Sequence, residues 1–296
     1  MPFAGEICGL LTAVCWSGSS LVFSAATLRV GPVRLNILRL TIAAALLFAV
    51  VMVSGADIQL SSHQMRNLAI SGIIGLVIGD TFLFKSYELI GARMGMLIMS
   101  AAPAIGALLA FLFLGEILSW IGVFGMGVTL FGISLVVLER RETIRNTRRL
   151  HFQGVIFGFL AAAGQGAALV MVKMAFNEGP INNFVATFIR IVSSVIVIWP
   201  LAWITGKIDN LFTIYKNDNT ALQLTLLGAF LGPFLGVTLC VFSVAHTKVG
   251  VAATLMATVP IFMLPLVKYI EKDRITWRAI IGAAIAVAGV AILFLR

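Results

Sequence analysis

The sequence is poor in charged and ionisable residues. Only 11% of its 296 residues are charged, with 12 acidic residues against 21 lysines and arginines, and there are three cysteines and three histidines. Because 60% of the residues are hydrophobic and the mean hydropathy is +1.06, the chain cannot hide its apolar side chains in a soluble core. We therefore expect the lipid bilayer as its surroundings. The net charge of +9 does not indicate a nucleic-acid partner, because the basic residues lie mainly at the ends of apolar runs.

Motifs of metal and cofactor chemistry are absent from the sequence. Cys8, Cys15 and Cys240 lie within apolar runs and form no CxxC pair, and there is no HExxH, GxSxG, Walker A or aspartate-rich diphosphate motif. The sequence therefore predicts no metal, no cofactor and no catalytic residue, and it favours a protein that is not an enzyme. The first residues lack a basic region and a clear cleavage site, so we expect the first apolar run to be a retained helix rather than a signal peptide.

Long apolar runs are what the sequence has in quantity. A helix needs about 20 mostly apolar residues to cross the hydrocarbon core, because every backbone polar group there must be bonded internally. Ten such runs predict an all-α integral membrane protein with ten transmembrane helices. The runs lie at about Ile7–Ala26, Leu35–Val53, Leu68–Tyr87, Met94–Leu114, Trp120–Leu138, Val155–Met174, Phe184–Ile204, Leu222–Val244, Val249–Val267 and Trp277–Leu295.

Small residues and prolines recur at fixed offsets between the two halves of the chain. Gly5 and Gly9 recur 149 residues later as Gly154 and Gly158. At an offset of 157 the matches are Ser71, Gly75 and Gly79 with Gly228, Gly232 and Gly236; Pro103 with Pro260; and Trp120, Gly125 and Gly132 with Trp277, Gly282 and Gly289. The agreement predicts a duplicated five-helix unit, at residues 1–138 and 151–296. The glycine stripes of the third and eighth runs predict close helix packing in the interior.

A basic linker at residues 139–150, ERRETIRNTRRL, separates the two units and carries five arginines. Five is an odd number, so two units in one chain enter the membrane in opposite orientations and form an inverted repeat. The loops on the linker side hold 14 lysines and arginines and those on the other side hold four. Basic residues collect on the cytoplasmic side, which predicts a cytoplasmic linker and both termini outside.

Two long segments resemble the repeats of a transporter family. They are SYELIGARMGMLIMSAAPAIGALLAFLFLGEILSWIGVFGMGVTLFGISLVV and AHTKVGVAATLMATVPIFMLPLVKYIEKDRITWRAIIGAAIAVAGVAILF. The proline midway along the fourth helix of each unit, the Leu114-Gly115-Glu116 turn and the glycine-spaced fifth helix are similar to an EamA-type carrier of the drug/metabolite transporter superfamily. The second unit departs from this pattern, with Tyr269-Ile270-Glu271 in place of LGE.

The resemblance implies a ten-helix carrier, often an exporter of amino acids or related metabolites. It also implies that the first, third and fourth helices of each unit line a central cavity, while the fifth and tenth helices pack together. Fusion of the two units makes a monomer sufficient in principle.

Ionisable residues inside the apolar runs are the first candidates for a transport site. Asp80 follows Gly79 in the third run, and a buried acid there suits proton coupling or substrate contact, with an ion pair to Arg39 as the structural alternative. Arg39 and Arg190 occupy matching places in the second and seventh runs. Each could bind a carboxylate, pair structurally or extend to the lipid headgroups.

Polar and aromatic residues in the same runs are further candidates for substrate contacts. Trp16 matches Gln165 at the offset of 149, and together they could supply an aromatic wall and a polar contact. Packing against lipid or protein is the alternative for each. The remaining candidates are Ser17, Ser20, Phe82 and Tyr87.

The sequence favours a secondary transporter in the cell inner membrane that exports small metabolites, with amino acids or related compounds as the expected substrates. We expect it to work against protons by alternating access. One alternative is an exporter of cationic drugs, but small relatives in the superfamily use a glutamate in the middle of the first helix, and here Glu6 lies at its edge. A membrane-embedded lipid-modifying enzyme would need clustered acids or histidines. A non-transporting scaffold would not require a duplicated glycine framework.

Overall fold

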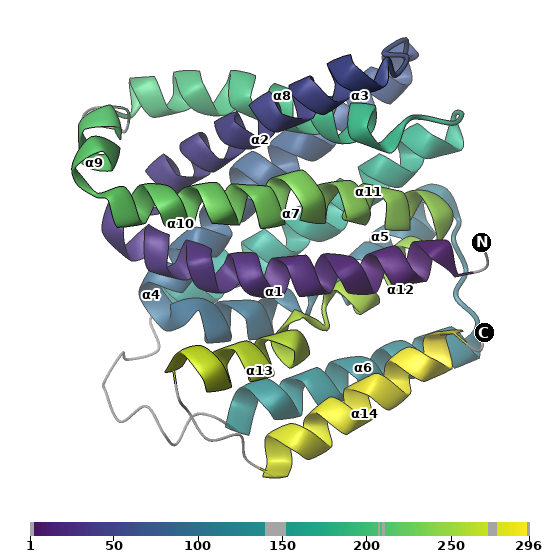
Figure 1. Ribbon diagram of the computed structural model, residues 1–296. Coiled ribbons are helices and arrows are strands. Elements are labelled where there is room, and N and C mark those ends of the chain that lie inside the picture. The colour runs from purple at the N-terminus through teal and green to yellow at the C-terminus, as the bar shows by residue number, and fades with distance from the viewer. Residues whose placement is uncertain (1–2, 140–151, 207, 209–210, 272–276, 295–296) are drawn as a thin grey trace.

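The computed structural model describes residues 3–139, 152–206, 208, 211–271 and 277–294, and within these ranges all regular structure is helical (Figure 1). Most helices run side by side along one direction of the molecule. We call the end at which the first helix begins the N-terminal end, and the end at which residues 139 and 152 lie the linker end. Residues 140–150 of the predicted linker lie outside the described residues.

The fourteen α-helices of the described residues are interrupted twice by π-helical segments. The elements are α1 (Ala4–Val30), α2 (Pro32–Ser54), α3 (Ser62–Gly72), η1 (Ile73–Gly79), α4 (Asp80–Met99), α5 (Ala102–Leu114), α6 (Trp120–Glu139), α7 (Phe152–Asn177), α8 (Asn183–Ile204), α9 (Leu211–Asn217), α10 (Asn219–Ala229), η3 (Phe230–Gly236), α11 (Val237–His246), α12 (Val249–Met256), α13 (Val259–Glu271) and α14 (Trp277–Phe294).

Seven stretches within the described residues are long and apolar enough to cross a membrane. They are Ala4–Val30, Pro32–Ser54, Ser62–Gly91, Phe152–Asn177, Asn183–Ile204, Asn219–His246 and Val249–Leu266. Three shorter apolar helices, at Ala102–Leu114, Trp120–Leu135 and Ile280–Leu293, account for the other predicted runs. Each of the ten runs therefore coincides with an apolar helix, and seven of them meet the length of a membrane span.

Two of the predicted runs are broken helices rather than continuous ones. A turn at Ser100 and Ala101 precedes α5, and a turn at Ala257 and Thr258 separates α12 from α13. A proline, Pro103 or Pro260, follows each turn, and because proline has no N–H it cannot bond back to the turn before it. α4 also changes direction near its end, at Gly91, whose φ of +84° lies in the region that favours glycine.

The irregular segments recur in both halves. The π-helical segments η1 and η3 are 157 residues apart, and the starts of α5 and α13 have the same separation. The repeated sequence therefore specifies repeated departures from α-helical geometry as well as repeated helices. The short helix α9 was not expected from the sequence and lies between α8 and α10.

Close approach of helices explains several of the repeated glycines. A Cβ on Gly132 of α6 would lie 2.4 Å from the backbone nitrogen of Ala286 in α14, and a Cβ on Gly289 would lie 2.4 Å from the Thr129 hydroxyl. No side chain larger than hydrogen fits at such distances. α6 and α14 therefore pack along each other, as the family resemblance implies, and they lie at one side of the bundle (Figure 1).

The predicted glycine stripes also lie against neighbouring helices. A Cβ on Gly75 would lie 2.9 Å from that of Ala168 in α7, and one on Gly79 would lie 3.7 Å from the carbonyl oxygen of Ala161, also in α7. In the second stripe Gly228 and Gly232 face the ring of Phe23 in α1. Gly236 faces the Trp16 indole, and the Ser71 hydroxyl donates to the carbonyl of Leu68.

Candidate functional site

A cavity lies near the middle of the bundle, between the two halves of the chain. Its volume is about 120 Å³, counted as the space open to the centre of a water molecule. This is room for roughly ten waters, or a metabolite of about that many non-hydrogen atoms. The lining comes from the first, third and fourth spans of each half, as the resemblance implies, and also from α2 and α8; none of it comes from α6 or α14. Both broken helices border the cavity, through Pro103 and Pro260.

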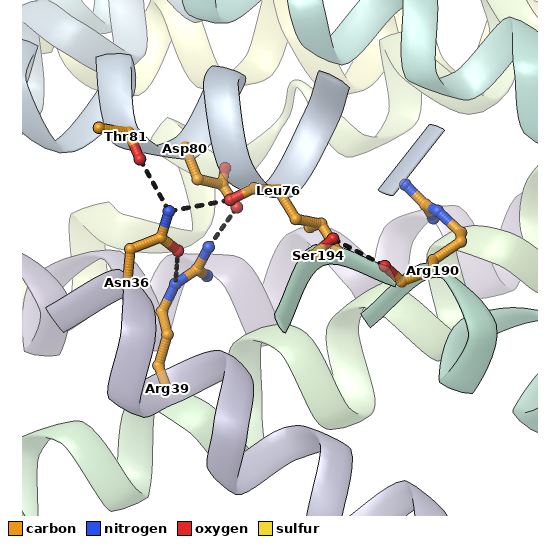
Figure 2. A network of polar contacts seen from close by, with 7 residues as sticks. All are labelled: Asn36, Arg39, Leu76, Asp80, Thr81, Arg190 and Ser194. Atoms are coloured by element: carbon orange, nitrogen blue, oxygen red, sulfur yellow. Dashed lines mark hydrogen bonds and ion pairs between the residues drawn. The ribbon is translucent and has the colours of Figure 1, made fainter. Parts of the chain in front are cut away.

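Asp80 lies at the centre of a polar network in this cavity (Figure 2). Its carboxylate forms an ion pair with the guanidinium of Arg39. Arg39 also donates from Nε to the Asn36 amide oxygen at 2.9 Å, and the Asn36 amide nitrogen donates to the carbonyl of Leu76 and the hydroxyl of Thr81, both at 2.9 Å. The network joins α2 to the junction of η1 and α4.

The π-helical segment makes one backbone carbonyl available to this network. The backbone N–H of Asp80 bonds to the carbonyl of Gly75, five residues earlier, rather than to that of Leu76. In an α-helix the Asp80 N–H would bond to Leu76. The Leu76 carbonyl instead accepts from the Asn36 side chain, so the local change in helical geometry fixes the position of Asp80 beside α2.

Aromatic rings hold Arg39 on two sides. Its guanidinium carbon lies 5.2 Å from the centroid of the Phe23 ring and 4.8 Å from that of Phe84. Such contacts stabilise a desolvated cation. Arg39 is 4% exposed, so it does not extend to the membrane surface. The sequence left three roles open for Arg39: binding a substrate carboxylate, pairing structurally or extending to the lipid headgroups. In the structure it forms an ion pair with Asp80.

Arg190 borders the same cavity from α8 but lacks comparable partners. The residue is 1% exposed, and its Nε and Nη1 atoms are buried without a hydrogen-bond acceptor. The Cys240 thiol and the Asp80 carboxylate lie close enough to interact electrostatically with the Arg190 guanidinium. In Figure 2 no hydrogen bond or ion pair joins the Arg190 guanidinium to another residue drawn. Arg190 likewise does not extend to the headgroups.

Close packing fixes the backbone that carries Arg190. A Cβ on Gly72 of α3 would lie 2.1 Å from the Arg190 carbonyl oxygen, so α3 and α8 approach to backbone contact. The Ser194 hydroxyl donates to the same carbonyl at 2.7 Å. Gly75 is also a close neighbour of the guanidinium, since a Cβ there would lie 3.7 Å from the Gln165 amide oxygen and 3.8 Å from Arg190 Nη2.

The other predicted site residues divide between the cavity and the packing around it. Trp16, Ser20, Gln165 and Tyr87 line the cavity with Asp80, Arg39 and Arg190. Ser17 does not line it, and its hydroxyl donates to the carbonyl of Val14 at 2.7 Å. Phe82 also lies outside the lining and stacks on Phe157 with ring centroids 5.5 Å apart. These two residues are packing residues in this structure.

Sequence reasoning missed three contributors to the site. Asn36 orients Arg39, and its signal was present as a second polar residue three positions before Arg39, on the same helical face. Phe23 and Phe84 give no signal in the sequence, because their role depends on the approach of α1 to α4.

Polar contacts connect the two halves at the N-terminal end. The Glu116 carboxylate accepts from the backbone N–H of Val249 at 2.9 Å, at the start of α12, where helix dipoles favour a negative charge. The Lys248 ammonium donates to the carbonyl of Ile117 at 2.7 Å. Each contact joins a residue before the linker to one after it. We refer to Glu116, Ile117, Lys248 and Val249 as the N-terminal clasp.

Lys173 supports the neighbouring helix end. Its ammonium donates to three carbonyl oxygens at the end of α11, those of Val244, Ala245 and Thr247, at 3.0, 3.3 and 3.0 Å. A cation at a helix C-terminus satisfies carbonyls that have no partner within the helix. The Thr247 hydroxyl also donates to Glu6 of α1 at 3.3 Å. Polar contacts thus join α1, α7, α11 and α12 and the end of α5 at the N-terminal end.

An apolar helical bundle with a central cavity that contains a buried ion pair, broken helices at the cavity wall and a duplicated framework is typical of a membrane transporter. The comparisons specify the class further. The model of the EamA-like transporter family matches residues 3–138 and 152–295, and the chain belongs to this family. It is therefore a multi-pass membrane transporter, and the two matched segments correspond to the two halves described above.

The chain is also similar to a curated protein and to a solved structure. An "Uncharacterized transporter" of Clostridium kluyveri is 26% identical over 142 residues, which cover 48% of this chain and 44% of the relative. The match thus spans less than half the length of the curated relative. A solved structure described as "Crystal structure of protein" has a TM-score of 0.78 and 18% identity, and the alignment covers 100% of this chain and 98% of that one. This likeness shows the fold alone.

Proposed function

We propose that this transporter exports small metabolites, with amino acids and related compounds as its substrate class, and couples their movement to protons by alternating access. The observation that carries the proposal is the Asp80–Arg39 pair inside a cavity enclosed by both halves of the chain. An ion pair at the membrane interior is costly to maintain, and it is typical of substrate and proton pathways.

The pair provides a route for coupling. The Asp80 carboxylate can be neutralised either by Arg39 or by a proton, and its side chain is 18% exposed, so the cavity reaches it. Protonation of Asp80 releases Arg39 from the ion pair, while the aromatic rings and Asn36 still hold the guanidinium. The charge of the cavity therefore changes with the proton, which links proton binding to substrate binding.

The two halves are proposed to act as inverted five-helix repeats. The repeated π-helical segments and helix breaks lie around the cavity in both halves, which suits a site at the interface of two related units. Alternating access then requires the N-terminal clasp to open while the linker end closes. In this proposal the linker is cytoplasmic and the protein resides in the cell inner membrane as a functional monomer.

Flux measurements on the purified protein in liposomes test the proposal. Vesicles carrying an internal pH dye are exposed to single amino acids, aromatic ones and threonine included, with and without a pH gradient. We expect at least one amino acid to move protons in the wild type. Asp80→Asn should abolish proton movement but retain substrate exchange, because asparagine resembles the protonated acid.

Asp57→Asn is the matched control, since Asp57 is an exposed acid in the loop before α3 and its carboxylate accepts from the nearby backbone N–H of Gln59. It should transport like the wild type. Normal proton coupling in Asp80→Asn would contradict the coupling role. Movement of lipophilic cations in place of amino acids would assign the chain to the alternative class of cationic-drug exporters.

A further inference from the structure

The charged groups that border the cavity do not balance. Two arginines and one acid line it among the described residues. The acid, Asp80, pairs with Arg39, which leaves the Arg190 guanidinium as the unmatched charge. Transfer of an unpaired cation out of water costs far more than a hydrogen bond returns, so such a group requires compensation.

The two arginines differ in what they can offer a ligand. The Arg39 guanidinium forms an ion pair with Asp80, a hydrogen bond to Asn36 and contacts with the faces of two aromatic rings. Arg190 keeps two buried nitrogen positions, Nε and Nη1, without an acceptor. These two nitrogens lie on different edges of the guanidinium, and each shares its edge with Nη2, the nitrogen nearest to Gly75. A carboxylate would therefore bind across Nη2 and one of them with two parallel hydrogen bonds.

The surroundings of Arg190 favour an anion of limited size and charge. Helices α5 and α13 begin at the cavity wall, near Pro103 and Pro260, and helix N-termini attract negative charge. Gly75, which carries no side chain, and the Gln165 amide are close neighbours of the guanidinium. One unmatched positive charge fits a single carboxylate better than a phosphate carrying close to two charges.

We propose that Arg190 is the receptor for the substrate, and that it binds the substrate's carboxylate through Nη2 together with one of the two nitrogens that lack an acceptor. The inference deepens the proposed function, because it rests on this cavity as the transport site and names the group by which the substrate is recognised. Recognition by Arg190 selects acids, zwitterionic amino acids among them, over their uncharged or cationic derivatives. Arg39 has a different role and holds Asp80.

Ligand binding to the detergent-purified protein tests the assignment without transport. The probes are L-phenylalanine and L-threonine, their carboxamides, and inorganic phosphate, and the readout is the shift in thermal unfolding as a function of ligand concentration. Loss of a charge-assisted bidentate contact lowers affinity by about 10- to 100-fold. We expect the wild type to bind at least one acid that much more tightly than its amide, and to bind phosphate weakly.

Substitutions separate recognition from folding. In Arg190→Gln the preference for acid over amide should disappear. In Arg190→Lys a reduced preference should remain, because lysine keeps the positive charge but cannot offer two parallel N–H donors to a carboxylate. Arg66→Lys, at an exposed position of α3 outside the cavity lining, should retain the full preference. Gel filtration checks that each variant is folded. The ratio of the affinities for acid and amide is measured within one variant, so it does not depend on the stability of that variant.

Several outcomes overturn the assignment. Equal affinity of the wild type for acid and amide, a preference that persists in Arg190→Gln, or stronger binding of phosphate than of any acid would each refute it. Failure of the flux assay is distinguishable from these outcomes. The protein could bind acids in a way that depends on Arg190 and yet move no protons in the flux assay. This result would support Arg190 as the receptor and contradict the proton-coupled function.

Discussion

Replacement of Arg39 by methionine should destabilise the protein far more than an exposed substitution of the same kind. Methionine fills the space between the Phe23 and Phe84 rings but leaves Asp80 without its counter-charge. Removal of one partner of a buried ion pair costs about 3–5 kcal/mol. The Asn36 oxygen also loses the Nε donor, at about 1–3 kcal/mol. The variant should therefore lose at least about 4 kcal/mol of unfolding free energy.

Reversible unfolding in mixed micelles, titrated with sodium dodecyl sulfate, measures this loss. Arg66→Met is the matched control, because Arg66 is exposed in α3 and should change stability by less than about 0.5 kcal/mol. The double variant Arg39→Met/Asp80→Asn should be more stable than Arg39→Met alone, since it no longer buries an unpaired charge. A double variant whose loss equals the sum of the two single losses would refute the coupling between the two residues.

Three further predictions follow from the packing and the polar contacts. Gly72→Ala places a methyl group against the backbone of α8 and should cost about 3 kcal/mol in the same unfolding assay, whereas Gly127→Ala, which meets nothing within 4 Å, should cost nothing. Glu116→Gln weakens the N-terminal clasp and should raise the labelling rate of a cavity cysteine from the N-terminal end about fivefold; an unchanged rate would exclude the clasp as a gate. Hydrogen bonds from the backbone of Ala221, then the Arg29 side chain, hold the pKa of Asp218 below its usual range. Its stabilisation is thus present at neutral pH and is lost as the pH falls through the lowered pKa, so the difference in melting temperature between wild type and Asp218→Asn should shrink as the pH falls below the ordinary pKa of aspartate, about 3.9.

The helices and the duplicated framework were predictable from the sequence because the length of an apolar run and the positions of small residues can be read directly from it. A run of about 20 apolar residues specifies a membrane helix wherever it occurs. The glycines that permit contact between α6 and α14 recur at a fixed offset. The prolines at 103 and 260 were identified as well, yet the breaks before them were not, because a proline in a membrane helix is compatible with either a kink or a full turn.

The candidate site was predictable only in part. Rarity of charge in an apolar run marked Asp80, Arg39 and Arg190, and the structure places all three around one cavity. The different surroundings of the two arginines could not be read from the sequence. They depend on which helices meet, with the aromatic rings of α1 and α4 beside Arg39 and small residues beside Arg190.

Ser17 and Phe82 show the limit of the same reasoning. Both lie in the cavity-lining helices, but their side chains point to other neighbours, the backbone of α1 and the ring of Phe157. A polar or aromatic residue type identifies a candidate without fixing its direction. The direction of the side chain depends on how its helix is rotated about its own axis in the bundle. The sequence does not give this rotation.

The access of the cavity to the two sides of the membrane tests the central claim most directly. The experiment uses a single cysteine in place of Met99, which lines the cavity, in a chain whose three native cysteines are replaced by alanine. The protein is inserted in liposomes in one orientation and treated with a membrane-impermeant thiol reagent from either side. Alternating access predicts labelling from both sides, with a ratio that changes when substrate or a pH gradient is added. Labelling from one side alone under every condition would contradict the account.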